Sequence, residues 1–348
     1  MNDSTVHERE IITSIAGVCG AKGSESLLPV FEGIGDDCAV LPPLSGSAAL
    51  AVTTDTMVEG VHFCMDYFTP WFVGRKLGAV NLSDMAAQGA VPQWAFLNLA
   101  LPDRWRRDME TFVRPFAAGL CSVLGRYGAI LAGGDTVAAP HAIMVSLTLM
   151  GRVSEAGWMR RSGACPGDMI YCSGPLGEAA AGLRLLERFR GRVVRKLGIS
   201  RHVTRCLTRR HLDPVPRVGL GRLLVSQGLA SAGMDISDGI ATDLAHMCQA
   251  SGTGAVLDAW RLPLSRALKV ACRRWRDLGD PMDLALFGGE DFELLWAVPP
   301  EKHIGMVKQV TALTGSPPFL LGRMVDGRGV WLATAGGRTE ITFQGYEH

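Results

Sequence analysis

Apolar residues recur along the first half of the chain with two periodicities, one typical of helices and one typical of strands. Positions three and four apart predict helices over residues 7–20, 71–88 and 104–127. Shorter apolar runs bounded by turn residues predict strands over residues 48–53, 94–101, 129–132 and 141–153. Because strands alternate with helices, this half is expected to have an α/β or α+β fold.

The same alternation starts again after a stretch that is rich in Gly, Ser, Pro and Arg, around residues 155–168. In the second half we expect strands over 169–172 and 232–236 and helices over 176–189 and 240–250. A length of 348 residues is enough for two domains of ordinary size. The sequence therefore predicts two α/β domains, residues 1–155 and 156–348.

Acidic residues follow the predicted strands in a repeated pattern. The stretch 33–41 holds two glycines and the adjacent pair Asp36 and Asp37 before a short apolar run. Neighbouring side chains on an extended chain point to opposite faces, so at most one of the two faces a given site. Taken alone, a Gly-Asp pair is ordinary turn chemistry. The pattern of an apolar segment with an acidic residue occurs five times, at Asp37, Asp55, Asp84, Asp135 and Asp235.

Carboxylates gathered in one site repel each other unless a cation compensates them. Hydroxyl groups accompany them at Thr53, Thr54, Thr136 and Ser237. Hard oxygen ligands of this kind select Mg²⁺ or Mn²⁺, and Mg²⁺ commonly binds phosphate-bearing substrates. Each Asp by itself could equally cap a helix or a turn, but strand ends in α/β sheets are where sites form, so the five together favour a site.

Composition and charge narrow the classes of function. A formal net charge of +1 gives no overall field that would attract nucleic acid or an anionic membrane. The first ten residues lack the features of a signal peptide, and no apolar run approaches the ~20 residues of a membrane span. The nine cysteines are scattered and form no C-x-x-C pair. These features predict a cytoplasmic protein with free thiols.

Several catalytic signatures are missing from the sequence. It contains no Gly-Lys dipeptide and hence no P-loop, and no His-Glu-x-x-His zinc motif. His62, in a Gly-rich loop after Asp55, is the histidine with the best claim to a role, although an ordinary exposed loop histidine is an equal reading. The arginine-rich tract 188–210 predicts a solvated helical face, with phosphate or nucleic-acid contact as the second reading.

Eight motifs, in order along nearly the whole chain, resemble those of the thiamine-monophosphate kinases. They are Gly-Ile-Gly-Asp-Asp-Cys-Ala at 33–39, Thr-Thr-Asp-Thr-Met-Val-Glu-Gly-Val-His-Phe at 53–63, Ala-Val-Asn-Leu-Ser-Asp-Met-Ala-Ala at 79–87, Gly-Gly-Asp-Thr at 133–136, Arg-Ser-Gly-Ala-Cys-Pro-Gly-Asp at 161–168, Met-Asp-Ile-Ser-Asp-Gly at 234–239, Gly-Gly-Glu-Asp-Phe-Glu-Leu at 288–294 and Gly-Tyr at 345–346. The resemblance implies the two-domain α/β (α+β) subunit of the aminoimidazole ribonucleotide synthetase superfamily, with mixed sheets packed against helices. It also implies a homodimer formed through the N-terminal domains, with ATP near the domain junction.

The resemblance further implies transfer of the γ-phosphoryl group of ATP to thiamine monophosphate, with several Mg²⁺ ions and without a phosphoenzyme or general base. The positions that match metal ligands are Asp37, Thr53, Thr54, Asp55, Asp84, Asp135, Asp235 and Asp238. Those that match nucleotide contacts are Gly134, Asp135, Arg161 and Ser237. Those that match substrate contacts are His62, Glu290 and Phe343, the last at a position where the family often has Trp.

Two alternatives remain open from the sequence. One is a sister activity such as that of selenophosphate synthetase, because Cys19 precedes Gly20, Ala21 and Lys22 in a loose likeness to the reactive loop of that enzyme. A helix end is the more natural reading of Cys19. The other is a protein that senses Mg-ATP without turnover. Filled acidic positions count against such a loss of activity.

Overall fold

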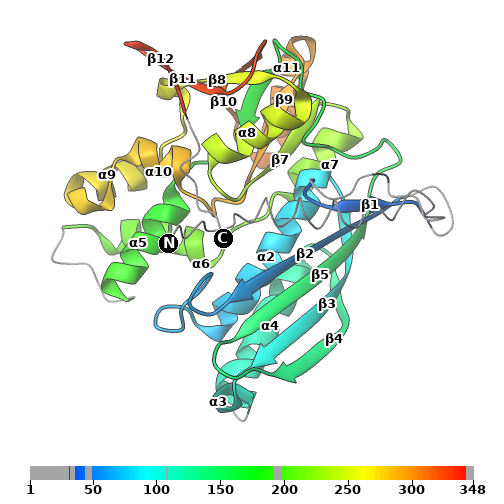
Figure 1. Ribbon diagram of the computed structural model, residues 1–348, viewed down its shortest axis with the longest axis vertical. Coiled ribbons are helices and arrows are strands. Elements are labelled where there is room, and N and C mark those ends of the chain that lie inside the picture. Colours follow the sequence, from blue (N-terminus) through cyan, green and yellow to red (C-terminus); the bar gives the residue numbers. More distant parts are fainter. Residues whose placement is uncertain (1–30, 32–35, 44–48, 107–108, 191–197, 342–348) are drawn as a thin grey trace, which may run out of the picture.

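The computed structural model describes residues 31, 36–43, 49–106, 109–190 and 198–341. The helix expected over 7–20 therefore lies outside the described residues. The described elements form two sheets, one in each half of the chain, with helices packed on them (Figure 1). Both sheets mix parallel and antiparallel neighbours, which confirms the predicted fold class. Among the described helices, none is long and apolar enough to cross a membrane.

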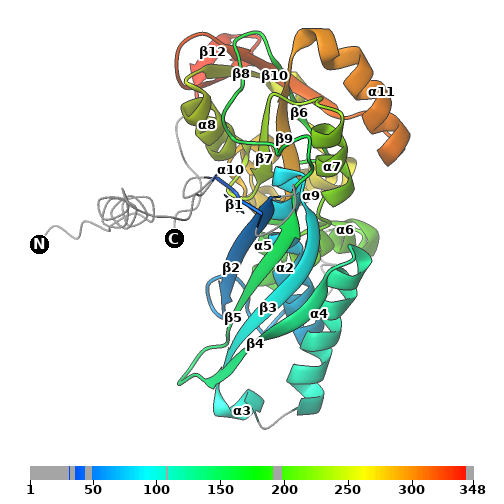
Figure 2. The same cartoon turned by 90° about the vertical axis from the view of Figure 1, so that its right-hand side faces the viewer.

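The first sheet has five strands, and helices cover one of its faces (Figure 2). In spatial order the strands are β1 (Ala39–Leu41), β2 (Leu50–Val58), β5 (Met144–Arg152), β3 (Val91–Leu101) and β4 (Ile130–Ala138). Helices α2 (Pro70–Gln88) and α4 (Arg114–Arg126) pack together on the covered face. The opposite face leaves large apolar side chains exposed, among them Trp94, Phe96 and Ile130.

Two strands of this sheet are longer than the sequence predicts. The run 48–53 extends to Val58 because β2 pairs with β5 from Leu50 to Val58, which places Asp55 inside the strand. The run 129–132 extends to Ala138 because β4 pairs in parallel with β3, which places Asp135 inside that strand. Both predictions ended the strand too early, because polar residues at the open face of a sheet or at a cavity, as at Asp55, interrupt the apolar pattern without breaking the pairing.

The segment predicted as one helix over 104–127 is not a single regular α-helix in the described residues. The observed elements are α3 (Asp103–Arg106), a π-helical turn (Met109–Val113) and α4. The π-helical turn runs directly into α4, since Val113 has helical φ and ψ, and Pro115 follows that junction. Because proline lacks an N–H, it removes one hydrogen bond of a regular α-helix, which favours a local change of helical geometry there. The apolar periodicity predicted the helical character of the segment but not its π-helical turn.

Helix α2 is the central element of the molecule. Thr69 caps its start, Pro70 occupies the first turn, and Gly89 ends it in the left-handed conformation with φ 68°. The helix is buried on nearly all sides, between the first sheet, α4 and α7 (Val218–Ser226). Most polar residues of this helix therefore lie in the interior of the molecule.

The second sheet has seven strands and helices on both faces (Figures 1 and 2). In spatial order they are β12 (Gly337–Glu340), β11 (Val330–Thr334), β8 (Gly254–Asp258), β10 (Phe319–Val325), β6 (Met169–Cys172), β9 (Glu293–Val298) and β7 (Ala232–Ile236). The accompanying helices are α5 (Glu178–Phe189), α6 (Arg201–Leu212), α7, α8 (Ile240–Ser251), α9 (Arg266–Arg274), α10 (Pro281–Phe287) and α11 (His303–Thr314), with 3₁₀ turns η3 (Ala259–Arg261), η4 (Arg276–Leu278) and η5 (Pro300–Lys302).

The two halves share one hydrophobic core. Tyr171 and Trp296 of the second sheet belong to the same buried cluster as Leu77 and Leu82 of α2. A separate cluster lies between the other face of the second sheet and α8. The boundary between residues 155 and 156 falls in the connection from β5 to β6, and it stays a prediction.

Candidate active site

A cavity of about 640 Å³ lies where the two halves meet. It brings together most of the predicted site residues, which are far apart in the sequence. Those that line it are Asp37, Thr53, Thr54, Asp55, His62, Asp84, Arg161, Asp235, Ser237, Asp238 and Glu290. Lys76, which the sequence analysis did not single out, lines it as well.

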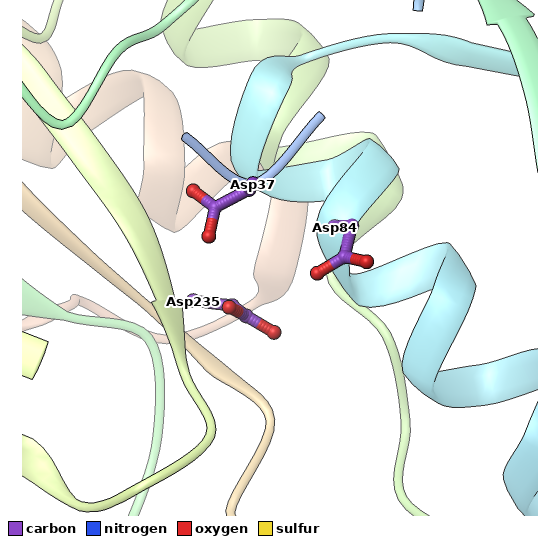
Figure 3. Close-up of side chains that lie close together, drawn as sticks. All are labelled: Asp37, Asp84 and Asp235. Atoms are coloured by element: carbon purple, nitrogen blue, oxygen red, sulfur yellow. The ribbon is translucent and has the colours of Figure 1, made fainter. Parts of the chain in front are cut away.

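Three carboxylates form the centre of this cavity. One oxygen atom each of Asp37, Asp84 and Asp235 lies within 4.8 Å of the others (Figure 3). Asp37 comes from the segment before β1, Asp84 from α2 and Asp235 from β7, so the cluster needs both halves of the chain. Such a spacing of oxygen ligands suits a divalent cation.

The electrostatics of the cluster favour the same conclusion. Burial, followed by the charges of Asp55 and Asp235, raises the pKa of Asp84 well above its ordinary value. Burial and the charge of Asp37 raise the pKa of Asp235 to about 7, against hydrogen bonding from Ser83. Burial raises the pKa of Asp55 to about 6. Without a cation the site therefore tends to hold protons in place of metal, as expected for crowded carboxylates.

Hydroxyl groups fix the orientation of two of these carboxylates. The Thr53 hydroxyl donates to Oδ2 of Asp84, and the Ser83 hydroxyl donates to Oδ2 of Asp235 at 2.5 Å. Thr53 and Asp55 occupy alternate positions of β2, so both face α2. Thr54 lies on the other face of β2, with its hydroxyl 3.1 Å from that of Thr148.

Arg161 holds the segment that carries Asp36 and Asp37. Its guanidinium donates to Oδ1 of Asp37 at 2.5 Å, and its backbone N–H donates to Oδ2 of Asp36 at 3.2 Å. Oδ1 of Asp36 also accepts a hydrogen bond from Gln88 at 2.6 Å. Asp36 is thus used to anchor the loop, while Oδ2 of Asp37 is buried without a hydrogen-bond partner and remains available to a ligand.

A second charged group lies beside the carboxylates. Nζ of Lys76 donates to Oε1 of Glu290 at 2.7 Å, and Nδ1 of His211 lies 2.7 Å from Oε2 of the same residue. Although burial favours the neutral acid, Lys76 and His211 lower the pKa of Glu290 below its usual range. Glu290 also has a left-handed backbone, with φ 66°, a strained conformation that is common at functional sites. The signal for Lys76 was available in the sequence, since Arg75 and Lys76 are two adjacent cations within a largely apolar helix, and Arg75 pairs with Asp213 away from the cavity.

A smaller cavity of about 230 Å³ adjoins the first and shares His62, Ser237, Asp238 and Glu290 with it. Its remaining walls include Phe63, Tyr67, Leu183, Glu187 and His211. Three carboxylates and no lysine or arginine are among the described residues that line it. This combination suits a ring that carries a positive charge.

The three acidic residues of the motif at 288–294 make different contacts. Glu290 faces the cavity, whereas Asp291 accepts hydrogen bonds from the backbone of Gly177 and Ala179 at the start of α5. The buried Glu293 accepts from Arg217 at 2.6 and 2.7 Å and pairs with Arg210. Arg210 is 18% exposed at its side chain and so departs from the predicted solvated face, whereas Arg201, Arg205 and Arg209 of the same helix are exposed as that prediction requires.

Two of the predicted residues, although described in the structure, do not line the cavity. Gly134 and Asp135 lie on β4, at the outer edge of the first sheet and away from α2. A Cβ atom at position 134 would lie 1.8 Å from the carbonyl oxygen of Leu97, so the pairing of β3 with β4 by itself requires glycine there. Phe343 lies outside the described residues.

Comparison with protein families agrees with this architecture. The AIR synthase related protein, N-terminal domain, matches residues 35–153, and the corresponding C-terminal domain matches residues 166–332. The thiamine-monophosphate kinase of Salmonella typhimurium is 38% identical over 325 residues, which are 93% of each chain. That of Bacillus subtilis is 34% identical over 284 residues, 82% of each chain.

Solved structures extend the comparison. AaThiL complexed with AMPPCP and TMP is 31% identical, with a TM-score of 0.83 over 100% of this chain and 99% of the other. Thiamine-monophosphate kinase from Stenotrophomonas maltophilia is 34% identical, with a TM-score of 0.73 over 92% of this chain and 95% of the other. With the fold, the site geometry and these relatives in agreement, the chain belongs to the thiamine-monophosphate kinases, a family of AIR synthase related proteins.

Proposed function

We propose that this protein transfers the γ-phosphoryl group of ATP directly to thiamine monophosphate and so produces thiamine diphosphate and ADP. The observation that carries the proposal is the cluster of Asp37, Asp84 and Asp235, which lie within 4.8 Å of one another in a cavity of the size that small-molecule ligands occupy. Membership of the kinase family supports the choice of reaction.

Several Mg²⁺ ions fit the donor set. The raised pKa values of the buried carboxyl groups and the unpartnered Oδ2 of Asp37 are what a site built for cations would have. When bound, Mg²⁺ supplies positive charge that offsets the charge of the reacting phosphates. The residues proposed to hold it are Asp37, Thr53, Thr54, Asp55, Asp84, Asp235 and Asp238 within one chain, with Asp135 discussed below.

We assign ATP to the side of the cavity next to Arg161 and Ser237. Arg161 is the guanidinium at this site, and its contact with Asp37 keeps it fixed in place. A pre-positioned guanidinium suits phosphate oxygens, which it can bind through two parallel hydrogen bonds. Gly134 and Asp135 were expected to contribute to this subsite too.

We assign thiamine monophosphate to the adjoining smaller cavity, with its phosphate directed to the carboxylate cluster. Thiamine carries a positively charged thiazolium ring, and the acidic and aromatic walls of this cavity complement that charge. His62 and Glu290 border both cavities, so they lie at the junction where the acceptor phosphate would sit. Phe343 is proposed to stack on the thiamine ring.

The transfer needs no covalent intermediate. The acceptor is a phosphate monoester, whose oxygen is already ionised near neutral pH, so no general base has to remove a proton. The residues of the site therefore act by placing the two phosphates in line and by excluding water. We accordingly propose no nucleophilic residue.

The predicted homodimer would place Asp135 near a second copy of the chain. Asp135 is aligned across the strands with Asn98, Ser146 and Thr56, so it shares the open face of the first sheet with exposed apolar residues. A second copy packed on this face would bury those residues and bring Asp135 near the other chain. We therefore propose a dimer through the N-terminal sheets.

The reaction is tested by incubating the purified protein with ATP, Mg²⁺ and thiamine monophosphate and measuring thiamine diphosphate after oxidation to its fluorescent thiochrome. We expect product with Mg²⁺ and none in EDTA. Free thiamine in place of the monophosphate serves as the acceptor control. If ATP binds but no thiamine diphosphate forms, the proposed reaction is wrong.

A further inference from the structure

A separate cavity of about 380 Å³ lies on the second sheet, at the end that carries β12. Strands β10, β8, β11 and β12 and the turn η3 border it, in the part of the molecule farthest from the first sheet (Figure 1). It shares no residue with the two cavities of the active site. Nothing in the proposed reaction uses it.

The surface of the sheet forms the floor of this cavity. Its floor contains Gly322, Val256 and Ala333, which lie on three adjacent strands. A Cβ atom at position 322 would come within 2.0 Å of the carbonyl oxygen of Val256, so the close approach of β10 to β8 requires glycine. Long side chains, Arg323 on β10 and Arg338 on β12, stand at the two sides.

The register of the sheet places these two arginines on the same face. Arg323 pairs with Val256, and Arg338 pairs with Ala333, which in turn pairs with Asp258. Val256 and Asp258 are two residues apart on β8 and so point to one face. Arg323 and Arg338 stand three strand spacings apart across the sheet, roughly 14 Å, and two residues apart along it, roughly 7 Å, which together make about 16 Å. Two extended arginine side chains can close this distance from opposite sides around a small ligand.

The cavity has an excess of positive charge. It is lined by three arginines, and Asp258 is the carboxylate among the described residues that line it. Asp258 already pairs with Arg261 at 3.0 Å. Within the described part of the chain, neither Arg323 nor Arg338 has a carboxylate partner. Two guanidinium groups are thus left free to bind an anion.

An aromatic ring completes the site. Trp260, in η3, lines the cavity and is 67% exposed. An indole beside a pair of unpaired arginines offers a stacking surface next to phosphate-binding groups. We propose that this cavity binds an organic phosphate that carries an aromatic ring, with Arg323 and Arg338 on the phosphate and Trp260 on the ring. Nucleoside phosphates and thiamine phosphates share this chemistry.

The test uses isothermal titration calorimetry on the full-length protein in EDTA, which removes the divalent cations that the proposed active site needs in order to bind phosphates. ADP, thiamine diphosphate and inorganic pyrophosphate are titrated in parallel. We expect one saturable site per chain for ADP or thiamine diphosphate, and the tighter of the two identifies the source. Pyrophosphate, which lacks a ring, should bind more weakly, and Trp260→Ala should reduce the ring compounds to the level of pyrophosphate.

The double variant Arg323→Ala/Arg338→Ala should weaken binding at least tenfold. Arg222→Ala/Arg328→Ala removes the same charge from exposed residues outside the cavity and should change binding less than twofold. Absence of binding in EDTA, binding that survives the first double variant, or equal loss in the control would overturn the proposal. Equal affinity for pyrophosphate and the ring compounds would overturn the role of Trp260.

Discussion

Nζ of Lys76 lies 2.7 Å from Oε1 of Glu290, and this contact joins α2 of the first half to the 288–292 loop of the second. The lysine side chain is 1% exposed and Glu290 is 30% exposed. A buried cation of this kind is stable only while its partner is in place. The pair therefore links the packing of the two halves to the position of a proposed substrate contact.

Lys76→Met should lower the free energy of unfolding by about 2 kcal/mol, less than for a fully buried pair because Glu290 is partly solvated and keeps His211. It should also raise the KM for thiamine monophosphate more than it lowers kcat. Urea denaturation and steady-state kinetics measure both. The exposed Lys308→Met is the matched control. If a double-mutant cycle with Glu290→Gln gives no coupling energy, the contact has no such role.

Asp84→Asn should separate stability from activity. The change removes a charge whose burial is unfavourable and keeps an oxygen that can accept from Thr53, so the metal-free protein should melt at a higher temperature. Formation of thiamine diphosphate should fall about 100-fold or more, as when one group that stabilises charge is lost. Asp326→Asn, at an exposed turn, should change neither quantity. Undiminished turnover in Asp84→Asn would refute the assignment of the metal ligands.

The stability of the metal-free protein should depend on pH in a defined direction. Folding raises the pKa of Asp55 to about 6 and that of Asp235 to about 7, from an ordinary value of 3.8. Between about pH 4 and pH 7 the folded protein thus holds more protons than the unfolded chain, so the free energy of unfolding falls as pH rises through that window. Above it, these two groups cause no further change.

Thermal melts in EDTA across this range measure the effect. Adding Mg²⁺ should raise the melting temperature more at about pH 8 than at about pH 5, because cations compete with protons for the same oxygens. A stability in EDTA that rises with pH through the window, or an equal effect of Mg²⁺ at both pH values, would contradict the crowded-carboxylate site.

Phe96→Glu should convert the proposed dimer to a monomer. Phe96 is 39% exposed on the open face of the first sheet, beside other apolar side chains, and a charge there would have to be buried on assembly. Light scattering with size exclusion should give twice the 37.3 kDa of the chain for the unchanged protein and one chain mass for the variant. Ile304→Glu, a 78% exposed position on α11, should remain dimeric. A monomeric unchanged protein would disprove the dimer.

Local patterns in the sequence were enough for most elements. The helix over 71–88 and the strands over 169–172 and 232–236 are confirmed nearly to the residue, because apolar spacing and the neighbouring Pro and Gly act within one element. The acidic residues Asp37, Asp84 and Asp235 were also predicted to meet, because charges so placed need a common cation. The lengths of β2 and β4 were not, since pairing with β5 and β3 sets them.

The tertiary structure decided which polar residues share a site. Asp291 and Glu293 stand beside Glu290 in the sequence, yet one caps α5 and the other neutralises two arginines, because the chain turns through left-handed backbone at positions 290 and 292. Lys76 lines the cavity because α2, which carries it, is buried on nearly all sides. Asp135 does not line the cavity because β4, which carries it, is the outermost strand of the first sheet. Sequence determines what each segment can form by itself, whereas the distances between side chains on different segments arise only when the sheets and helices pack.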